Sequence, residues 1–218
     1  MKVVIAGGHG KIAMRLERLL SGRGDEVSGL IRNPDHADDV REAGARPVLC
    51  DLEHASEKEV AAAIEGCDAV VFAAGAGPGS GEARKETMDL GGAVKLIDAA
   101  KAGGVPRYVM ISSMGADPDA EGDGFAAYLR AKGRADAALA ASGLAYTVVR
   151  PGRLTDDAGT GRVAVGPFVE RADVPRDDVA AVLAAVLARE DLAGLRFEVT
   201  AGDQPVEEAV AGLAGGGS

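Results

Sequence analysis

The stretch KVVIAGGHGKIAMRL, residues 2–16, joins an apolar run to a glycine cluster and then to an amphipathic segment. The run VVIA predicts a buried strand, and the spacing of apolar residues after it predicts a helix over 11–20. Gly7 and Gly10 stand in the intervening turn, and Ala13 completes a G-x-x-G-x-x-A pattern. Such glycines let the backbone turn and approach a pyrophosphate, which the helix N-terminus attracts. The stretch therefore predicts a dinucleotide-binding turn, and a plain strand-to-helix turn is the alternative.

The same alternation of apolar runs and helical segments continues along the chain. Further strands are predicted over 26–32, 45–52, 68–75, 106–113, 145–152 and 195–200, with a smaller one over 161–166. Helices are predicted over 35–44, 56–66 (capped by Ser56), 83–102, 125–143 and 176–190. This order predicts an α/β fold of the Rossmann type, a doubly wound parallel sheet of about seven strands with helices on both faces.

We expect one domain over residues 1–218, with residues 153–195 on the substrate side and a flexible tail over 212–218. Ligands of such a sheet bind at the carboxyl ends of its strands, near the reversal of strand order.

The composition is that of a globular chain with an acidic surface. Of the 218 residues, 47% are hydrophobic and 3% aromatic, and the formal net charge is -10. An acidic surface repels phosphate backbones and anionic lipid, so we expect neither a nucleic-acid nor a membrane partner. No run is long enough to cross a bilayer and no signal peptide precedes the first strand, so we expect a cytoplasmic protein. Cys50 and Cys67 are expected to be free thiols, and no metal site is expected at Cys50 and His54.

The end of the second strand is where a dinucleotide fold distinguishes its cofactors. An acid there would bind the ribose hydroxyl of NAD, but this chain has Arg32, with no acid before Asp35. A guanidinium suits a 2′-phosphate, which favours NADP(H) over NAD(H), with Lys11 or His9 as a second contact. The alternative is a solvated arginine in a loop.

A series of motifs resembles the short-chain dehydrogenase/reductase superfamily, and in particular its compact, atypical NAD(P)H-binding branch related to nucleoside-diphosphate-sugar epimerases. They follow in the expected order as AGGHGKIA, IRNP, CDLE, VVFAAG, VMISSMGA, YLRAK and VVRPGRLT. The resemblance covers nearly the whole chain. It implies that Asp51 and Leu52 contact the adenine of the cofactor. It also implies that Ala73, Ala74 and Gly75 contact the ribose, and that Arg150, Pro151 and Gly152 contact the nicotinamide carboxamide. The predicted cofactor set also includes Gly7, Gly8, His9, Gly10, Lys11, Ile12, Arg32 and Lys132.

The predicted catalytic group consists of a serine, Tyr128 and Lys132. Tyr128 and Lys132 are four residues apart on a predicted helix, so their side chains share one face. A tyrosine with its ordinary pKa near ~10 is a poor base at neutral pH, and a neighbouring ammonium would assist it. Ser113, with Ser112 as the alternative, would bind the substrate oxygen at the end of the fifth strand. A Tyr–Lys pair at this spacing also arises by chance in helices.

Two departures from the superfamily pattern limit what the resemblance implies. Asp89 stands where many relatives carry asparagine, which removes a hydrogen-bond donor from the usual proton relay; its simpler interpretation is an acid on a helix surface. The short C-terminal region leaves little chain to bind a nucleotide sugar. The glycine-rich loop over 75–86 is either a lid over the site or a plain connection.

We therefore expect an NADP(H)-dependent oxidoreductase that acts on a small carbonyl or alcohol, as a monomer or homodimer. The alternatives are an epimerase or dehydratase and a non-catalytic NADP(H) sensor. Sensors of this branch tend to lack the Tyr–Lys pair, so its presence favours chemistry.

Overall fold

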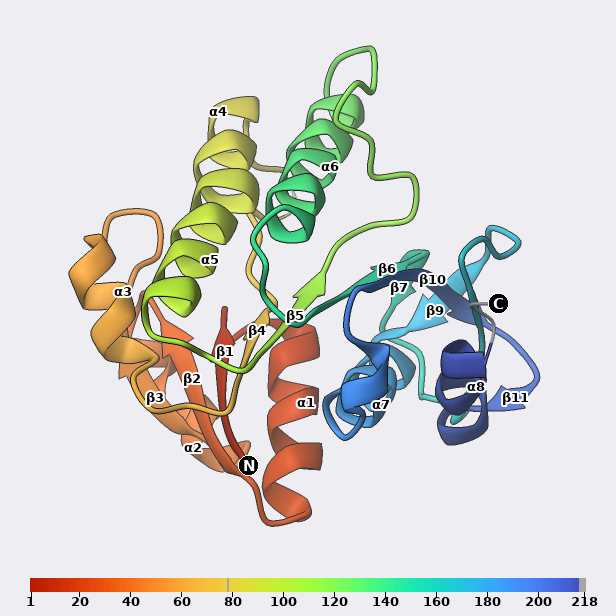
Figure 1. Ribbon diagram of the computed structural model, residues 1–218, viewed down its shortest axis with the longest axis horizontal. Helices are drawn as coiled ribbons and strands as arrows, with labels where there is room; N and C mark the ends of the chain where they lie inside the picture. The colour runs from red at the N-terminus through yellow and green to blue at the C-terminus, as the bar shows by residue number, and fades with distance from the viewer. Residues whose placement is uncertain (78, 216–218) are drawn as a thin grey trace.

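The computed structural model describes residues 1–77 and 79–215, and a nine-stranded sheet runs through its centre (Figure 1). The strand order is β11-β8-β10-β6-β5-β4-β1-β2-β3. Seven of the strands predicted from apolar runs form its parallel part, namely β1 (Lys2–Ala6), β2 (Glu26–Ile31), β3 (Arg46–Leu49), β4 (Ala69–Phe72), β5 (Arg107–Ile111), β6 (Tyr146–Pro151) and β10 (Leu195–Ala201). The predicted Rossmann-type α/β fold is confirmed.

The predicted count of about seven strands is too low. β8 (Arg162–Gly166) runs antiparallel to β10, and β11 (Gln204–Pro205) pairs with its outer edge. β7 (Arg153–Thr155) and β9 (Asp173–Pro175) form a separate parallel pair. Apart from β8, these strands have two or three residues, too few for a hydrophobic period to reveal them.

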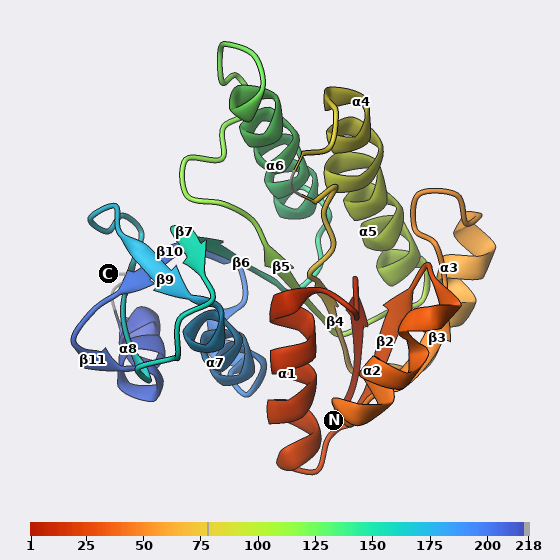
Figure 2. The ribbon, with the colours of Figure 1, turned by 180° about the vertical axis from the view of Figure 1, so that it is seen from behind.

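Helices cover both faces of the sheet (Figures 1 and 2). One face carries α1 (Lys11–Gly22), α2 (Ala37–Glu42), α7 (Arg176–Leu187) and α8 (Val206–Gly212), and the other carries α3 (Glu57–Ala63), α5 (Ala93–Ala102) and α6 (Phe125–Ala140). Successive side chains of β1 point to opposite faces of the sheet, so they belong to two separate parts of the hydrophobic core. Val3 and Ile5 pack in the cluster that includes α1 and α7, whereas Val4 and Ala6 pack in the cluster of α3, α5 and α6.

The helix predicted over 83–102 is not continuous α-helix. It consists of α4 (Glu82–Arg84), a π-helical segment η2 (Lys85–Gly92) and then α5. π-helical turns are rare and are often found at functional sites, because they redirect side chains out of the regular helical pattern. Asp89 lies within η2.

The flexible tail over 212–218 stays a prediction. Gly212 ends α8, and a 3-10 turn follows over Leu213–Gly215; residues 216–218 lie outside the described residues. Val206, Ala209 and Val210 of α8 are buried.

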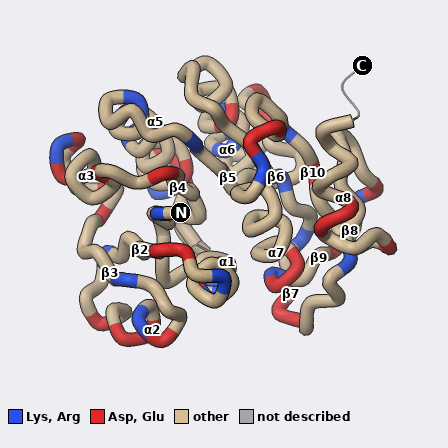
Figure 3. Tube along the Cα trace, turned by 60° about the horizontal axis from the view of Figure 1, so that its bottom comes forward, with Lys and Arg blue, Asp and Glu red and all other residues tan. Residues whose placement is uncertain are grey.

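Both cysteines are buried and free, as predicted. None of the described helices combines the length and apolarity needed to cross a bilayer. Lysines and arginines are dispersed among aspartates and glutamates along the trace (Figure 3).

Candidate active site

The glycine-rich turn after β1 forms a tight cradle at the carboxyl edge of the sheet. Gly7 has a φ of 81°, and a Cβ there would lie 2.8 Å from the Cα of Ala74. A Cβ on Gly8 would lie 2.6 Å from the Cα of Gly29. The N–H of Gly10 donates to the carbonyl of Gly7 at 2.8 Å and α1 begins at the next residue. The backbone therefore comes close to the neighbouring strands without side chains, as phosphate binding at a helix N-terminus requires.

This turn lies where the strand order reverses. β1 pairs with β2 on one side and with β4 on the other, so the chain crosses over β1 between β3 and β4. The predicted ribose-binding residues follow β4 and border the turn, because the position of a Cβ on Gly10 is 3.7 Å from the carbonyl oxygen of Ala73. The structure thus brings together the glycine turn and the segment from Ala73 to Gly75.

The three cations predicted for a 2′-phosphate differ in their surroundings. Arg32 follows β2, is exposed, and has no acidic partner within ion-pair distance among the described residues. His9 stacks on His36 with ring centroids 3.6 Å apart and bonds Asp39 at 2.7 Å. Lys11 instead binds Asp156, with its Nζ 2.5 Å from the carboxylate. Arg32 is therefore the one of the three that has no bonded partner.

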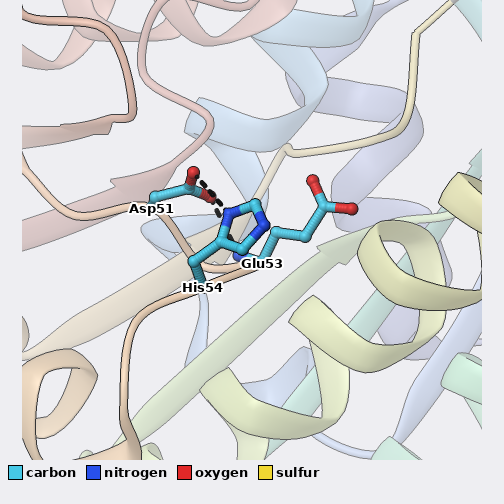
Figure 4. A group of neighbouring side chains, drawn as sticks. All are labelled: Asp51, Glu53 and His54. Atoms are coloured by element: carbon cyan, nitrogen blue, oxygen red, sulfur yellow. Dashed lines mark hydrogen bonds and ion pairs between the residues drawn. The ribbon is translucent and has the colours of Figure 1, made fainter.

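The predicted adenine-binding segment after β3 is a compact polar group (Figure 4). Asp51 accepts from the Nδ1 of His54 at 3.0 Å and from the N–H of Glu53 at 3.0 Å. Burial acts to raise the pKa of Asp51, but these hydrogen bonds outweigh it and hold the pKa below its ordinary value. Leu52 is buried beside them.

Asp51, Glu53 and His54 also bring three ligand-type atoms within 4.8 Å of one another. However, Glu53 already accepts from Thr87 at 2.5 Å and pairs with Arg84 at 3.5 Å, and His54 is bonded to Asp51. These three side chains therefore form a polar network with one another and with neighbouring residues of the protein.

Lys132 occupies a buried position between β5 and η2. Its side chain is 5% exposed, and its Nζ donates to the carbonyl of Ile111 at 3.2 Å. The Nζ also lies 5.8 Å from the ring centre of Tyr128, one turn earlier on α6. Burial acts to lower the pKa of Lys132, but the neighbouring acidic groups of Tyr128 and Asp89 outweigh it, so the pKa is raised. Lys132 therefore carries its charge beside Tyr128.

Asp89 is the partner of this ammonium. Its carboxylate is 1% exposed, lies 3.2 Å from the Lys132 Nζ, and accepts from the N–H of Ala76 at 3.1 Å. The interpretation of Asp89 as an acid on a helix surface is therefore wrong, because η2 turns it inward. A Cβ on Gly75 would lie 3.1 Å from its Oδ1, so Asp89 links the segment predicted to bind ribose to Lys132.

The two serines after β5 differ in access. Ser112 is buried, and its hydroxyl has no hydrogen-bond partner among the described residues. Ser113 is half-buried, and its hydroxyl donates to the carbonyl of Met114 at 3.3 Å. Ser113 is thus the more accessible of the two predicted hydroxyls.

A second buried ion pair, which the motifs did not predict, lies one turn further along α6. Asp136 accepts from the Nη2 of Arg150 at 2.8 Å and from its Nε at 2.9 Å. Burial raises the pKa of Asp136 despite this cation. The i, i+4 spacing from Lys132 could have indicated Asp136. The Arg150 guanidinium is held by α6, so its contact with a cofactor stays a prediction.

Glu17 was also missed, and it lies directly beneath the glycine turn. It is fully buried, neither carboxylate oxygen has a partner among the described residues, and burial raises its pKa to about 8, against a weaker opposing effect of Arg18. A Cβ on Gly29 would lie 2.6 Å from its Oε1. Helical spacing from Ala13 to Glu17 and Leu20 places this acid on the apolar face, which is the signal that could have revealed it.

Comparison with known proteins agrees with this geometry. A family model described as NAD(P)H-binding matches residues 7–190. The "Uncharacterized sugar epimerase YhfK" of Bacillus subtilis (strain 168) is 38% identical over 212 residues, covering 96% of this chain and 99% of that protein. A solved structure from Bacillus halodurans, provisionally named NAD-dependent epimerase/dehydratase, is 38% identical with a TM-score of 0.91, covering 98% of this chain and 100% of its own. The oxidoreductase YlbE of Lactococcus lactis is 28% identical with a TM-score of 0.87, over 98% and 96% of the two chains.

Proposed function

Because this chain belongs to the NAD(P)H-binding family, we propose that it is an NADP(H)-dependent oxidoreductase that interconverts a small carbonyl compound and its alcohol. The observation that carries the proposal is the buried, charged Lys132, held by Asp89 and the carbonyl of Ile111 one helical turn from Tyr128. A buried lysine is costly to desolvate, and its placement at the carboxyl edge of the sheet favours a chemical role.

The residues present fit a dinucleotide. A Cβ at Gly7 or Gly8 would collide with the backbone at Ala74 or Gly29, so glycine at both positions lets the turn pack closely against the neighbouring strands, as the turn of a pyrophosphate site does. Gly7, Gly8 and Gly10 would hold the phosphates, Asp51 and Leu52 the adenosine, and Lys132 the nicotinamide ribose. When bound, the nicotinamide supplies or accepts the hydride.

The proton that balances the hydride is assigned to Tyr128. In the reduction, Ser113 would donate a hydrogen bond to the substrate carbonyl and Tyr128 would transfer its hydroxyl proton to the same oxygen.

The experiment is the oxidation of NADPH by a panel of quinones, aldehydes and ketones, compared between the wild type and Tyr128→Phe. We expect Tyr128→Phe to lower kcat by about 100-fold or more while the quenching of NADPH fluorescence on binding is unchanged. Tyr146→Phe is the matched control, because Tyr146 begins β6 at the opposite edge of the sheet. Equal turnover by Tyr128→Phe and the wild type would refute the proton-transfer role.

The NADP(H) preference is assigned to Arg32, an exposed cation with no carboxylate within ion-pair distance in the part of the chain that the structure describes. Arg32→Gln should weaken NADPH binding by about 10-fold and leave NADH binding unchanged, since only the former has the 2′-phosphate. Arg46→Gln, at the amino end of β3, is the control. Tighter binding of NADH than NADPH by the wild type would overturn the preference.

A second candidate is epimerisation, which the names of two relatives favour. Hydride would leave the substrate and return to it, so NADPH would not be consumed. Net loss of absorbance at the reduced nicotinamide band therefore separates the two candidates.

A further inference from the structure

Arg171 differs from most arginines of this acidic chain. Basic residues are interspersed with acidic ones along the trace (Figure 3), and most arginines bind a carboxylate or a carbonyl oxygen. Across residues 1–77 and 79–215, the side chains of Arg32, Arg171 and Arg196 form no hydrogen bond or ion pair. Arg32 lies at the predicted phosphate end of the site, whereas Arg171 lies at the other end.

The backbone on either side of Arg171 is fixed to the sheet. The N–H of Val169 donates to the carboxylate of Glu198 at 3.1 Å, and the carbonyl of Glu170 accepts from the hydroxyl of Thr200 at 3.4 Å. The carbonyl of Ala172 passes so close to Gly152 that a side chain at Gly152 would collide with it. The segment is therefore held against β10 and against the RPG motif, which restricts where the Arg171 side chain can reach.

The guanidinium of Arg171 crosses to the loop after β5. Its Nη2 is 3.2 Å from the position that a Cβ on Gly115 would take, and the Leu129 side chain is 4.0 Å from the same position. Gly115 is two residues beyond Ser113, and Leu129 is adjacent to Tyr128. Arg171 therefore lies beside the loop and helix that carry the proposed catalytic hydroxyls.

Two exposed aromatic side chains lie on the segments that flank this position. Phe125 is 63% exposed and its ring centre is 5.6 Å from that of Tyr128. Phe168 is 89% exposed and precedes Arg171 by three residues on the same segment. Exposed aromatic rings suit contact with an apolar, planar partner.

We propose that Arg171 binds a carboxylate of the substrate, and that the substrate is an aromatic or otherwise planar carbonyl compound with this acid group. The inference rests on the proposed function for the fate of the carbonyl. Hydride would reach the carbonyl carbon and the Tyr128 proton its oxygen, while the carboxylate stays unchanged. A planar guanidinium pairs with a carboxylate through two parallel hydrogen bonds, which gives orientation as well as affinity.

The test compares 4-carboxybenzaldehyde with methyl 4-formylbenzoate, which differ in the charge of one group. Binding of each to the NADP⁺-saturated protein is measured by calorimetry, and reduction of each is measured with NADPH. We expect the wild type to bind the acid about 10- to 100-fold more tightly than the ester, the range for a hydrogen-bonded charged group. Arg171→Gln should remove this preference and leave ester binding unchanged, and Arg171→Lys should keep part of it.

Arg196→Gln is the matched control, because Arg196 is an exposed arginine on β10 whose side chain also has no hydrogen-bond or ion-pair partner among the described residues. It should retain the preference for the acid. Equal binding of acid and ester by the wild type, or an unchanged preference in Arg171→Gln, would overturn the carboxylate site.

The two proposals fail separately. If the ester is reduced and the acid is not preferred, the carboxylate site is wrong and the oxidoreductase proposal stands. If acid binding depends on Arg171 but no carbonyl compound is reduced, the oxidoreductase proposal is wrong and the anion site stands.

Discussion

Replacing Glu17 with methionine should stabilise the protein, and by an amount that grows with pH. Glu17 is buried against Gly8 and Gly29 without a hydrogen-bond partner among the residues described. Methionine has a similar unbranched shape and no polar group to bury, so it should fit the same space. The change tests whether this carboxyl group stays protonated in the folded protein.

The size of the effect follows from the pKa of Glu17 in the unfolded chain and its pKa in the folded chain. Burial raises the pKa of Glu17 from 4.5 to about 8. Between these two values the folded chain binds more protons at Glu17 than the unfolded chain does, so raising the pH lowers the free energy of unfolding. The stability that Glu17 contributes is thus fully present below pH 4.5 and is lost as the pH rises toward about 8. Each pH unit inside the window corresponds to about 1.4 kcal/mol.

The assay is urea unfolding of the wild type and Glu17→Met at pH 5.5 and pH 7.5. The difference in unfolding free energy between the two proteins should grow by about 3 kcal/mol between these pH values, because all other titrating groups are common to both. Glu65→Gln, which removes an exposed carboxylate, tests whether the loss of any acid gives the same slope. A difference that is constant with pH would refute the argument that Glu17 is buried in its protonated form.

Three further predictions concern the buried charges and the glycine turn. Lys132→Met should lower the free energy of unfolding by about 3–5 kcal/mol in urea, because it leaves the Asp89 carboxylate buried and unpaired, and adding Asp89→Leu should restore much of the loss. Arg150→Met should have a similar cost through Asp136, and thermal unfolding of Arg150→Met with and without Asp136→Leu measures it. Gly7→Ala should weaken NADPH binding at least about 10-fold in a fluorescence titration, since its Cβ meets Ala74, whereas Gly24→Ala, with a φ of 91° but open space around it, should leave binding unchanged.

The parallel part of the fold could be predicted from the sequence because buried parallel strands are continuous apolar runs. VVIA in β1 and AVVF in β4 are examples, and the helices between the strands show helical periodicity. β7, β9 and β11 could not be predicted, because strands of two or three residues are determined by their tertiary partners. The π-helical turns of η2 likewise have no signature in the spacing of its apolar residues.

Those residues of the candidate site that belong to sequence motifs could be predicted. The glycine turn, the serines after β5 and the Tyr128–Lys132 spacing were all found at the carboxyl edge or on α6. The partners of these residues were not predictable in the same way. Asp89 reaches Lys132 across 43 positions of sequence, a contact that depends on the π-helical turn. Arg171 reaches Gly115 from a segment held by hydrogen bonds to β10, which no local pattern encodes.

The two buried ion pairs of α6 connect the stability of this fold to the proposed chemistry. Tyr128, Lys132 and Asp136 follow one another at four-residue spacing, so they form one stripe on the helix. Lys132 joins this stripe to β5 and to Asp89 of η2, and Asp136 joins it to Arg150 of β6. Apolar side chains would hold the same helix without the desolvation of four charged groups. We infer that the pairs fix the position of α6, and with it the Tyr128 hydroxyl, relative to Ser113. In that case the paired replacement of Asp136 and Arg150 by apolar residues should restore stability but not turnover, because packing without directional bonds leaves the angle of α6 less strictly defined.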